Sequence, residues 1–261
     1  MAELDDAYAN AAYIPDADAI LARWVQDAEA YRAACGARYE RRRYGPSARS
    51  YFDLFLPEAD TENTLIFVHG GYWLKFDPSY WSHLAAGALA HGWAVAMPAY
   101  DLCPKVRIAD ITQQVAAAVE TVAWQRNGKL SLAGHSAGGH LVSRMLAPGM
   151  LMADTRARMT HVAPISPVTD LRPLLRTSMN ADFQMTEEDA WAESPVAQPK
   201  PETPVTVWVG AAERPVFLDQ ATWLADAWGC DKVVVPDQHH FNVIDPLADP
   251  NSDMVRRLTA G

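Results

Sequence analysis

The five residues Gly134-His135-Ser136-Ala137-Gly138 constrain the fold of this chain more than any other segment. They have the form G-x-S-x-G and lie between an apolar run at 130–133 and a helix-like run at 139–146. In that context the pattern is typical of a sharp strand-to-helix turn, which lifts one serine hydroxyl clear of its own backbone. We therefore expect a strand to end at this turn and Ser136 to be a nucleophile.

A second glycine-rich segment, His69-Gly70-Gly71-Tyr72-Trp73, follows another apolar run. Its His-Gly-Gly form is typical of a loop whose backbone N–H groups point at a developing oxyanion. Glycine at 70 and 71 permits backbone conformations with φ above zero, which turn the amides inward. The candidate oxyanion hole consists of the N–H groups of Gly71, Tyr72 and Ala137. A nucleophile, together with a place for the charge that it creates, indicates acyl transfer to water.

Short apolar runs alternate with helical patterns along most of the chain. The runs that we expect to be strands span 51–56, 65–68, 94–97, 130–133, 162–165, 205–209 and 233–235. Apolar residues recur at helical spacing in 16–34, 108–122 and 217–228. Continuous apolar runs suit strands that are buried on both faces of a parallel sheet. The alternation predicts an α/β fold, namely a doubly wound, mostly parallel sheet with helices on both faces.

The domain organisation follows from length and from one irregular stretch. A chain of 261 residues with 49% apolar residues fits a single α/β domain over 1–261. Residues 170–204 interrupt the alternation with five prolines and a helix start signal at 186–189. Because the next strand follows at once, we expect a lid-like excursion over the active-site end of the sheet rather than a linker.

The acid and the base are expected after the last two strands, since hydrolases with this turn use the chain order Ser, acid, His. Glu213 is the first carboxylate after the run at 205–209, and strand-end geometry favours it over Asp219, which lies in the predicted helix. Two histidines, His239 and His240, stand side by side after the last run. Adjacent side chains point in different directions, so only one of them can reach Ser136.

Taken together, these motifs resemble the α/β-hydrolase superfamily, and more closely its HGGxW-type arylformamidases, the kynurenine formamidases. The matching segments are HGGYW at 69–73, GHSAGGHL at 134–141, ERPVF at 213–217 and the pair His240-Phe241. The resemblance implies that His240 is the base and that Glu213 is the acid. Two departures stand out: Glu213 replaces the family's usual aspartate, and 166–171 reads SPVTDL where the family commonly has Ser-Gly-x-Tyr-Asp-Leu.

By the same resemblance, we expect a serine hydrolase that removes a formyl group from an aryl amide such as N-formyl-kynurenine through an acyl-enzyme. No metal or organic cofactor is implied. The alternative is a carboxylesterase that acts on short-chain or aryl esters with the same triad. The expected pocket residues are His69, Gly70, Trp73 and Phe241, because an aryl leaving group calls for an aromatic wall. His69 also suits a bracing role, through hydrogen bonds within its own loop.

Composition excludes several other classes of function. The formal net charge of −10 argues against nucleic acid, whose phosphates require clustered Lys and Arg, and it gives an anionic membrane little to attract. Cys35, Cys103 and Cys230 are too few and too scattered for a disulfide framework. The first residues lack the apolar core of a signal peptide, and no apolar run approaches the roughly 18 residues of a membrane span. We expect a cytoplasmic enzyme whose partner is a small-molecule substrate.

Overall fold

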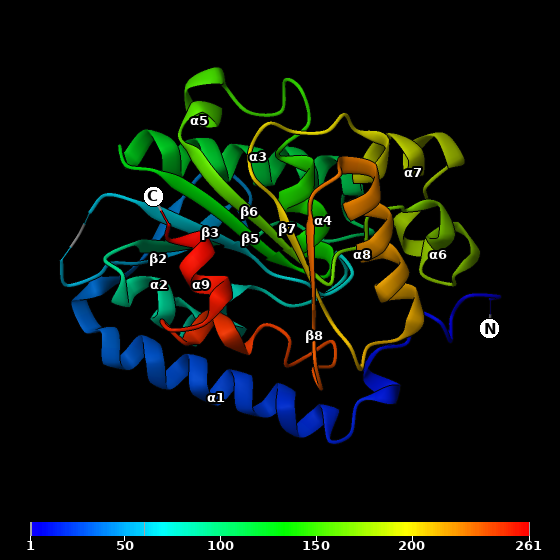
Figure 1. Ribbon diagram of the computed structural model, residues 1–261, viewed down its shortest axis with the longest axis horizontal. Helices are drawn as coiled ribbons and strands as arrows, with labels where there is room; N and C mark the ends of the chain where they lie inside the picture. Colours follow the sequence, from blue (N-terminus) through cyan, green and yellow to red (C-terminus); the bar gives the residue numbers. More distant parts are fainter. Residues whose placement is uncertain (1, 60, 261) are drawn as a thin grey trace.

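The computed structural model describes residues 2–59 and 61–260, and an eight-stranded sheet runs through its centre (Figure 1). The strands are β1 (Tyr39–Arg43), β2 (Tyr51–Phe55), β3 (Thr64–Val68), β4 (Ala94–Pro98), β5 (Leu130–His135), β6 (Met159–Ile165), β7 (Thr206–Gly210) and β8 (Asp231–Val235). Their spatial order is β1-β2-β4-β3-β5-β6-β7-β8. Strand β2 is antiparallel to both of its neighbours, and every pair from β4 to β8 is parallel.

Helices cover both faces of this sheet (Figure 1). One face packs against α3 (Ile108–Gln125), α4 (Ala137–Arg144) and α8 (Pro215–Trp228), and the other against α1 (Ala17–Cys35), α2 (Ala86–Ala90) and α9 (Asp253–Leu258). Alternate residues of β3 belong to the two different cores, Ile66 to the first and Phe67 to the second. The predicted doubly wound α/β fold is therefore confirmed.

Shorter elements fill the connections. The remaining α-helices are α5 (Ala153–Ala157), α6 (Asn180–Phe183) and α7 (Glu187–Glu193), and the 3₁₀ turns are η1 (Ala11–Tyr13), η2 (Gly36–Arg38), η3 (Pro78–Tyr80), η4 (Ser82–Ala85), η5 (Arg172–Arg176), η6 (Pro195–Ala197) and η7 (Asp245–Ala248). None of the helices in the described part of the chain has the length and apolar character needed to cross a bilayer.

The strands at the two edges of the sheet differ from the sequence expectation. Strand β1 was not expected, because its sequence YERRR contains no apolar run. Polar contacts hold it instead, among them an ion pair in which Arg41 Nε lies 2.7 Å from Oδ1 of the buried Asp53. The run at 233–235 is indeed a strand, β8, but it lies at the opposite edge and its Val234 is exposed.

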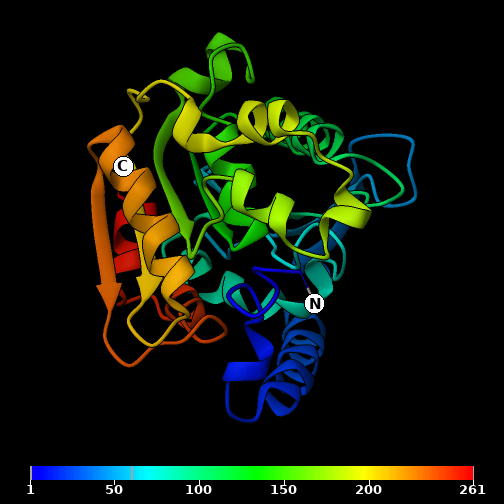
Figure 2. The same cartoon turned by 90° about the vertical axis from the view of Figure 1, so that its right-hand side faces the viewer.

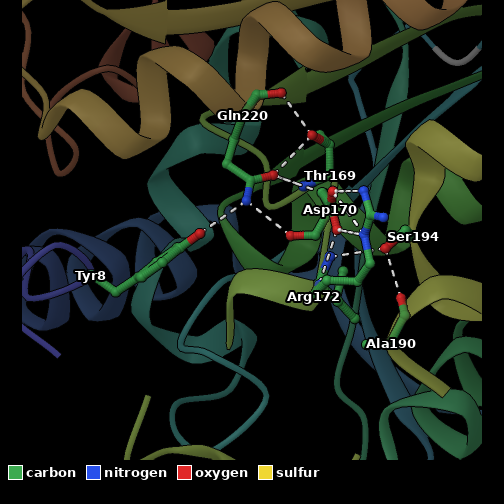
Figure 3. Close-up of polar contacts among 8 residues, drawn as sticks. Tyr8, Thr169, Asp170, Arg172, Ala190, Ser194 and Gln220 are labelled. Carbon is green, nitrogen blue, oxygen red and sulfur yellow. Dashed lines mark hydrogen bonds and ion pairs between the residues drawn. The ribbon is translucent and has the colours of Figure 1, made fainter. Parts of the chain in front are cut away.

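The stretch 170–204 folds as η5, α6, α7 and η6, and a single buried side chain fastens its beginning to α8 (Figure 3). Gln220 Oε1 accepts hydrogen bonds from the backbone N–H groups of Thr169 and Asp170, at 2.6 and 2.8 Å. Its Nε2 donates to the carbonyl of Asp170 at 2.9 Å and to the hydroxyl of Tyr8 at 3.0 Å. One amide therefore connects α8, the excursion and the N-terminal segment.

Three histidines, the buried His69 and His140 and the half-buried His161, make the stability of this fold dependent on pH. Burial lowers the pKa of His69, His140 and His161 to about 4 each, from an ordinary value of 6.5. In the unfolded chain these imidazoles bind protons below about pH 6.5, whereas in the folded protein they remain neutral down to about pH 4. The stability that this difference contributes is complete above pH 6.5 and is lost as the pH falls through that window.

We predict that the free energy of unfolding decreases by roughly 3–5 kcal/mol between pH 7 and pH 5, since each such histidine contributes about 1.4 kcal/mol per pH unit. Asp245 works in the opposite direction, because burial raises its pKa to about 6, but it is one group against these three and the buried His135, whose pKa burial also lowers. Urea unfolding at both pH values measures the change. His161→Gln should reduce the pH dependence, and the same substitution at the exposed His91 should not. An unchanged urea midpoint in the parent protein would contradict the prediction.

Candidate active site

Ser136 stands at the junction between β5 and α4 in a strained backbone conformation, with φ 56° and ψ −116°. Its N–H donates to the carbonyl of Ile165 in the neighbouring β6 at 2.8 Å, which holds the turn against the sheet. A Cβ atom on Gly138 would lie 2.0 Å from the carbonyl oxygen of Val68, and one on Gly134 would lie 2.2 Å from that of Gly138. Only glycine fits at these two positions. The sharp turn therefore requires both glycines of the G-x-S-x-G sequence.

The glycine-rich loop after β3 approaches this turn closely. Gly71 has φ 110°, and its carbonyl accepts hydrogen bonds from the N–H groups of Leu74 and Lys75 at 3.0 and 3.2 Å. Gly70 does not adopt a positive φ; its role is steric, because a Cβ there would lie 2.9 Å from the carbonyl oxygen of His135 and 3.1 Å from the Cβ of Ser136. The two glycines thus serve different purposes, one for the turn and the other for close approach to the serine.

Three backbone amides near Ser136 have no partner within the protein. Among the residues that the structure describes, the N–H groups of Gly71, Tyr72 and Ala137 donate to no acceptor. Ala137 is also the first residue of α4, where the helix dipole favours negative charge. Amides without a partner can bind an anionic group.

His240 lies against a buried carboxylate. Its Nδ1 is 2.6 Å from Oε2 of Glu213, whose side chain is fully buried. The other oxygen of Glu213 accepts hydrogen bonds from the N–H of Gly210, at 2.9 Å, and from the hydroxyl of Ser166. A carboxylate accepts hydrogen bonds, so this contact favours the imidazole tautomer with its hydrogen on Nδ1 and a lone pair on Nε2. That tautomer is the one that can accept a proton from a hydroxyl group.

A second histidine supports the first. Nε2 of His135 donates to the carbonyl of His240 at 2.8 Å, and the Phe217 ring centroid lies 4.4 Å from that of His240. Burial, and next the neighbouring His240, hold the pKa of His135 well below its usual range, so that His135 is neutral. Sequence reasoning assigned no role to His135 or to Ser166. The available signal for Ser166 was its position at the end of a predicted strand, in the segment 166–171.

The two rival residues lie elsewhere. Nδ1 of His239 accepts hydrogen bonds from the N–H groups of Phe241 and Asn242, at 3.1 and 3.3 Å, so this ring braces the loop after β8. Asp219 is exposed on α8. Of the two histidines and the two carboxylates considered, the structure brings together His240 and Glu213.

A cavity of about 250 Å³ opens beside Ser136 and His240. Gly70, Gly71, Tyr72 and Phe241 line it, as does the N-terminal segment 8–12. No residue of 170–204 contributes to its lining, so the lid-like role of this excursion stays a prediction. Figure 2 faces this end of the molecule, with the N-terminal segment in blue and α6 and α7 in yellow-green.

Two of the expected pocket residues lie outside the cavity lining, contrary to the sequence analysis. His69 is buried; its Nδ1 donates to the carbonyl of Gly70 at 2.7 Å, and its ring stacks on Tyr100 with 4.2 Å between centroids. Trp73 is buried as well and packs edge-on against His140 and Phe183. His69 therefore braces the loop, and Trp73 anchors the loop in the core.

The N-terminal segment forms a wall that sequence reasoning missed. The hydroxyl of Tyr72 donates to the carbonyl of Tyr8 at 2.7 Å and accepts from Nδ2 of Asn10 at 3.3 Å. An ion pair between Arg214 and Asp6, with 2.7 Å between Nη2 and Oδ2, fastens the same segment to the loop before α8. The local sequence AYANAAY carries neither periodicity nor a chemical motif, so nothing in it indicated this position.

The fold is that of an α/β hydrolase, and the chain belongs to that family: residues 65–237 match the family described as alpha/beta hydrolase fold. A curated relative is the kynurenine formamidase of Danio rerio, 29% identical over 230 residues, which cover 82% of this chain and 78% of the relative.

Solved structures show the same fold as this chain. A crystal structure described as a "putative thioesterase" from Silicibacter sp. tm1040 is 56% identical, has a TM-score of 0.98 and covers 100% of both chains. A hyperthermophilic esterase from the archaeon Pyrobaculum calidifontis, 17% identical with a TM-score of 0.69, covers 93% of this chain and 89% of its own. This second similarity concerns the fold alone.

We predict that Gly138→Ala destabilises the protein by at least about 4 kcal/mol, because its methyl group would meet the backbone carbonyl of Val68, which cannot move aside. The matched control is Gly149→Ala, where a Cβ meets open space and only the positive φ of 76° costs about 1–2 kcal/mol. Urea midpoints of both variants provide the test. Similar midpoints would show that close contact at Gly138 does not constrain the turn.

Proposed function

We propose that this protein is a serine hydrolase that removes a small acyl group, formyl in particular, from an aryl amide such as N-formyl-kynurenine. The proposed catalytic residues are Ser136 as nucleophile, His240 as base and Glu213 as the acid that orients the base. The observation that carries the proposal is the 2.6 Å contact between His240 Nδ1 and the buried Glu213, at a cavity that Ser136 also lines.

The first half of the reaction forms an acyl-enzyme. Nε2 of His240 takes the hydroxyl proton of Ser136 as Oγ attacks the carbonyl carbon of the substrate. Negative charge then develops on the carbonyl oxygen, and the amides of Gly71, Tyr72 and Ala137 stabilise it; such donors typically lower a barrier by about 2.7–4 kcal/mol each. His240 next protonates the leaving nitrogen, the C–N bond breaks, and the amine departs.

The second half repeats these steps with water. His240 takes a proton from a water molecule whose oxygen attacks the formyl ester of Ser136, and the same amides hold the oxyanion. Collapse of the intermediate breaks the bond to Oγ and releases formate, while His240 returns the proton to the serine. Glu213 remains ionised throughout and stabilises the imidazolium that forms in each half.

Two observations support an aryl amide as substrate. The curated relative from Danio rerio is named kynurenine formamidase. The aromatic side chains of Trp24, Trp81 and Phe241 line the cavity, and its volume of about 250 Å³ suits one aromatic ring with a very small acyl group.

An ester or thioester substrate is the second candidate. It is favoured by the "putative thioesterase" title of the 56% identical structure. The same triad and the same amides serve either leaving group. In both cases we propose a cytoplasmic enzyme with a small-molecule substrate, independent of cofactors, nucleic acid and membranes.

We predict that the wild-type protein hydrolyses N-formyl-kynurenine with a higher kcat/KM than either 4-nitrophenyl acetate or an acetyl thioester. Steady-state kinetics on the three substrates decide among formamidase, esterase and thioesterase. A higher value on either ester would select the second candidate.

The control for this measurement is Ser136→Ala, which should abolish turnover of all three substrates and prevent labelling by a fluorophosphonate probe. Labelling that persists in this variant would remove Ser136 from the mechanism.

We predict that Glu213→Gln lowers kcat roughly 10³–10⁴-fold, because an amide at this position no longer holds His240 in the required tautomer. The volume is conserved, and circular dichroism should show an unchanged fold. Asp219→Asn, at the exposed rival carboxylate, removes the same charge and should retain normal turnover. A loss of less than tenfold in Glu213→Gln would contradict the proposed role.

A further inference from the structure

The cavity beside Ser136 is mostly apolar. Leu21, Trp24, Phe76, Trp81 and Phe241 contribute to its walls, and the described lining residues include no aspartate or glutamate. Such walls accommodate an aromatic or aliphatic body, but they offer nothing to a charged group on the substrate. Recognition of a charge therefore depends on the few polar residues at the cavity.

Lys75 is the lining residue that carries a permanent charge. It is exposed, and its Nζ lies 5.1 Å from the ring centroid of Phe76, which also lines the cavity. The backbone fixes its position: the N–H of Lys75 donates to the carbonyl of Gly71 at 3.2 Å, so one tight turn separates the lysine from the proposed oxyanion amides. Ser136 and the exposed Lys75 therefore line the same cavity.

The ammonium group of Lys75 has no carboxylate partner among the residues that the structure describes. Several arginines around the same end of the molecule are paired, including Arg172 with Asp170 at 2.6 Å and Arg214 with Asp6 at 2.7 Å. Within residues 2–59 and 61–260, by contrast, Lys75 forms no ion pair. The charge is available to a ligand.

We infer that Lys75 recognises an anionic group of the substrate, at the end remote from the bond that is cleaved. The inference rests on the proposed function and deepens it: it names the residue that recognises the carboxylate which N-formyl-kynurenine carries on its aryl part. A formal charge of −10 on the whole chain repels anions in general. The ammonium group of Lys75 thus provides a local attraction for a negatively charged group. A substrate can place its carboxylate near Lys75 while its apolar part enters the cavity.

The test compares two substrates that differ only in charge, 3-(4-acetoxyphenyl)propanoate and the corresponding propanamide. Wild-type enzyme should show the higher kcat/KM on the carboxylate, mainly through a lower KM. Lys75→Met keeps most of the apolar stem, and it should lower the ratio of the two kcat/KM values by about threefold to tenfold, the range expected for a partly exposed ion pair. Raising the salt concentration should reduce the wild-type ratio in the same direction.

The matched control is Lys129→Met, which changes the net charge equally at the amino end of β5, the end away from Ser136. It should leave the ratio at its wild-type value. A wild-type ratio of the two kcat/KM values near one would overturn the inference. An equal loss of kcat/KM for both substrates in Lys75→Met would also overturn it, since a structural role of the lysine lowers both kcat/KM values together.

A binding measurement separates this inference from the proposed function. Dissociation constants of the unreactive pair 3-phenylpropanoate and 3-phenylpropanamide, followed by the fluorescence of the cavity tryptophans, do not depend on turnover. The inference would be supported if the wild-type protein bound the carboxylate more tightly than the amide and Lys75→Met abolished that preference. This support would hold even if neither ester were hydrolysed. Failure of hydrolysis with intact discrimination would instead count against the proposed chemistry alone.

Discussion

The buried carboxylate of Glu213 is the constraint on which the rest of the candidate site depends. A carboxylate out of contact with water costs several kcal/mol unless hydrogen-bond donors surround it. Here the donors come from three segments: Ser166 after β6, Gly210 at the end of β7 and His240 after β8. The carboxyl ends of three parallel strands are thereby tied together, and the imidazole acquires a fixed orientation and tautomer.

Close backbone packing provides the other half of the site. Gly138 brings the start of α4 against the end of β3, and Gly70 brings the loop after β3 against Ser136. The serine and the amides beside it therefore keep a fixed relation that does not depend on flexible side chains. Preorganisation of this kind favours the binding of a transient charge, because little has to rearrange when the charge appears.

The N-terminal segment links this chemistry to the periphery of the fold. Tyr8 is buried and its hydroxyl contacts Gln220 on α8 (Figure 3). Its carbonyl accepts a hydrogen bond from the hydroxyl of Tyr72. Gln220 in turn holds the first residues of the excursion. The cavity wall, the loop after β3 and the stretch 170–204 thus share one hydrogen-bonded network, which connects segments more than 200 positions apart in the sequence.

The sequence by itself determined the elements that have a local signal. Buried parallel strands appear as continuous apolar runs, and the motif around Ser136 identifies its own turn because only glycine tolerates the contacts at 134 and 138. Strand β1 left no such signal, because backbone pairing with β2, one ion pair and the stacking of Tyr39 on Phe55 hold it, and none of these needs an apolar run. Tertiary structure alone decided that 8–12 and not 170–204 forms the cavity wall, that Trp73 lies in the core, and that Ser166 and His135 support Glu213 and His240. These outcomes depend on contacts between residues distant in sequence, and no local pattern of amino acids encodes such contacts.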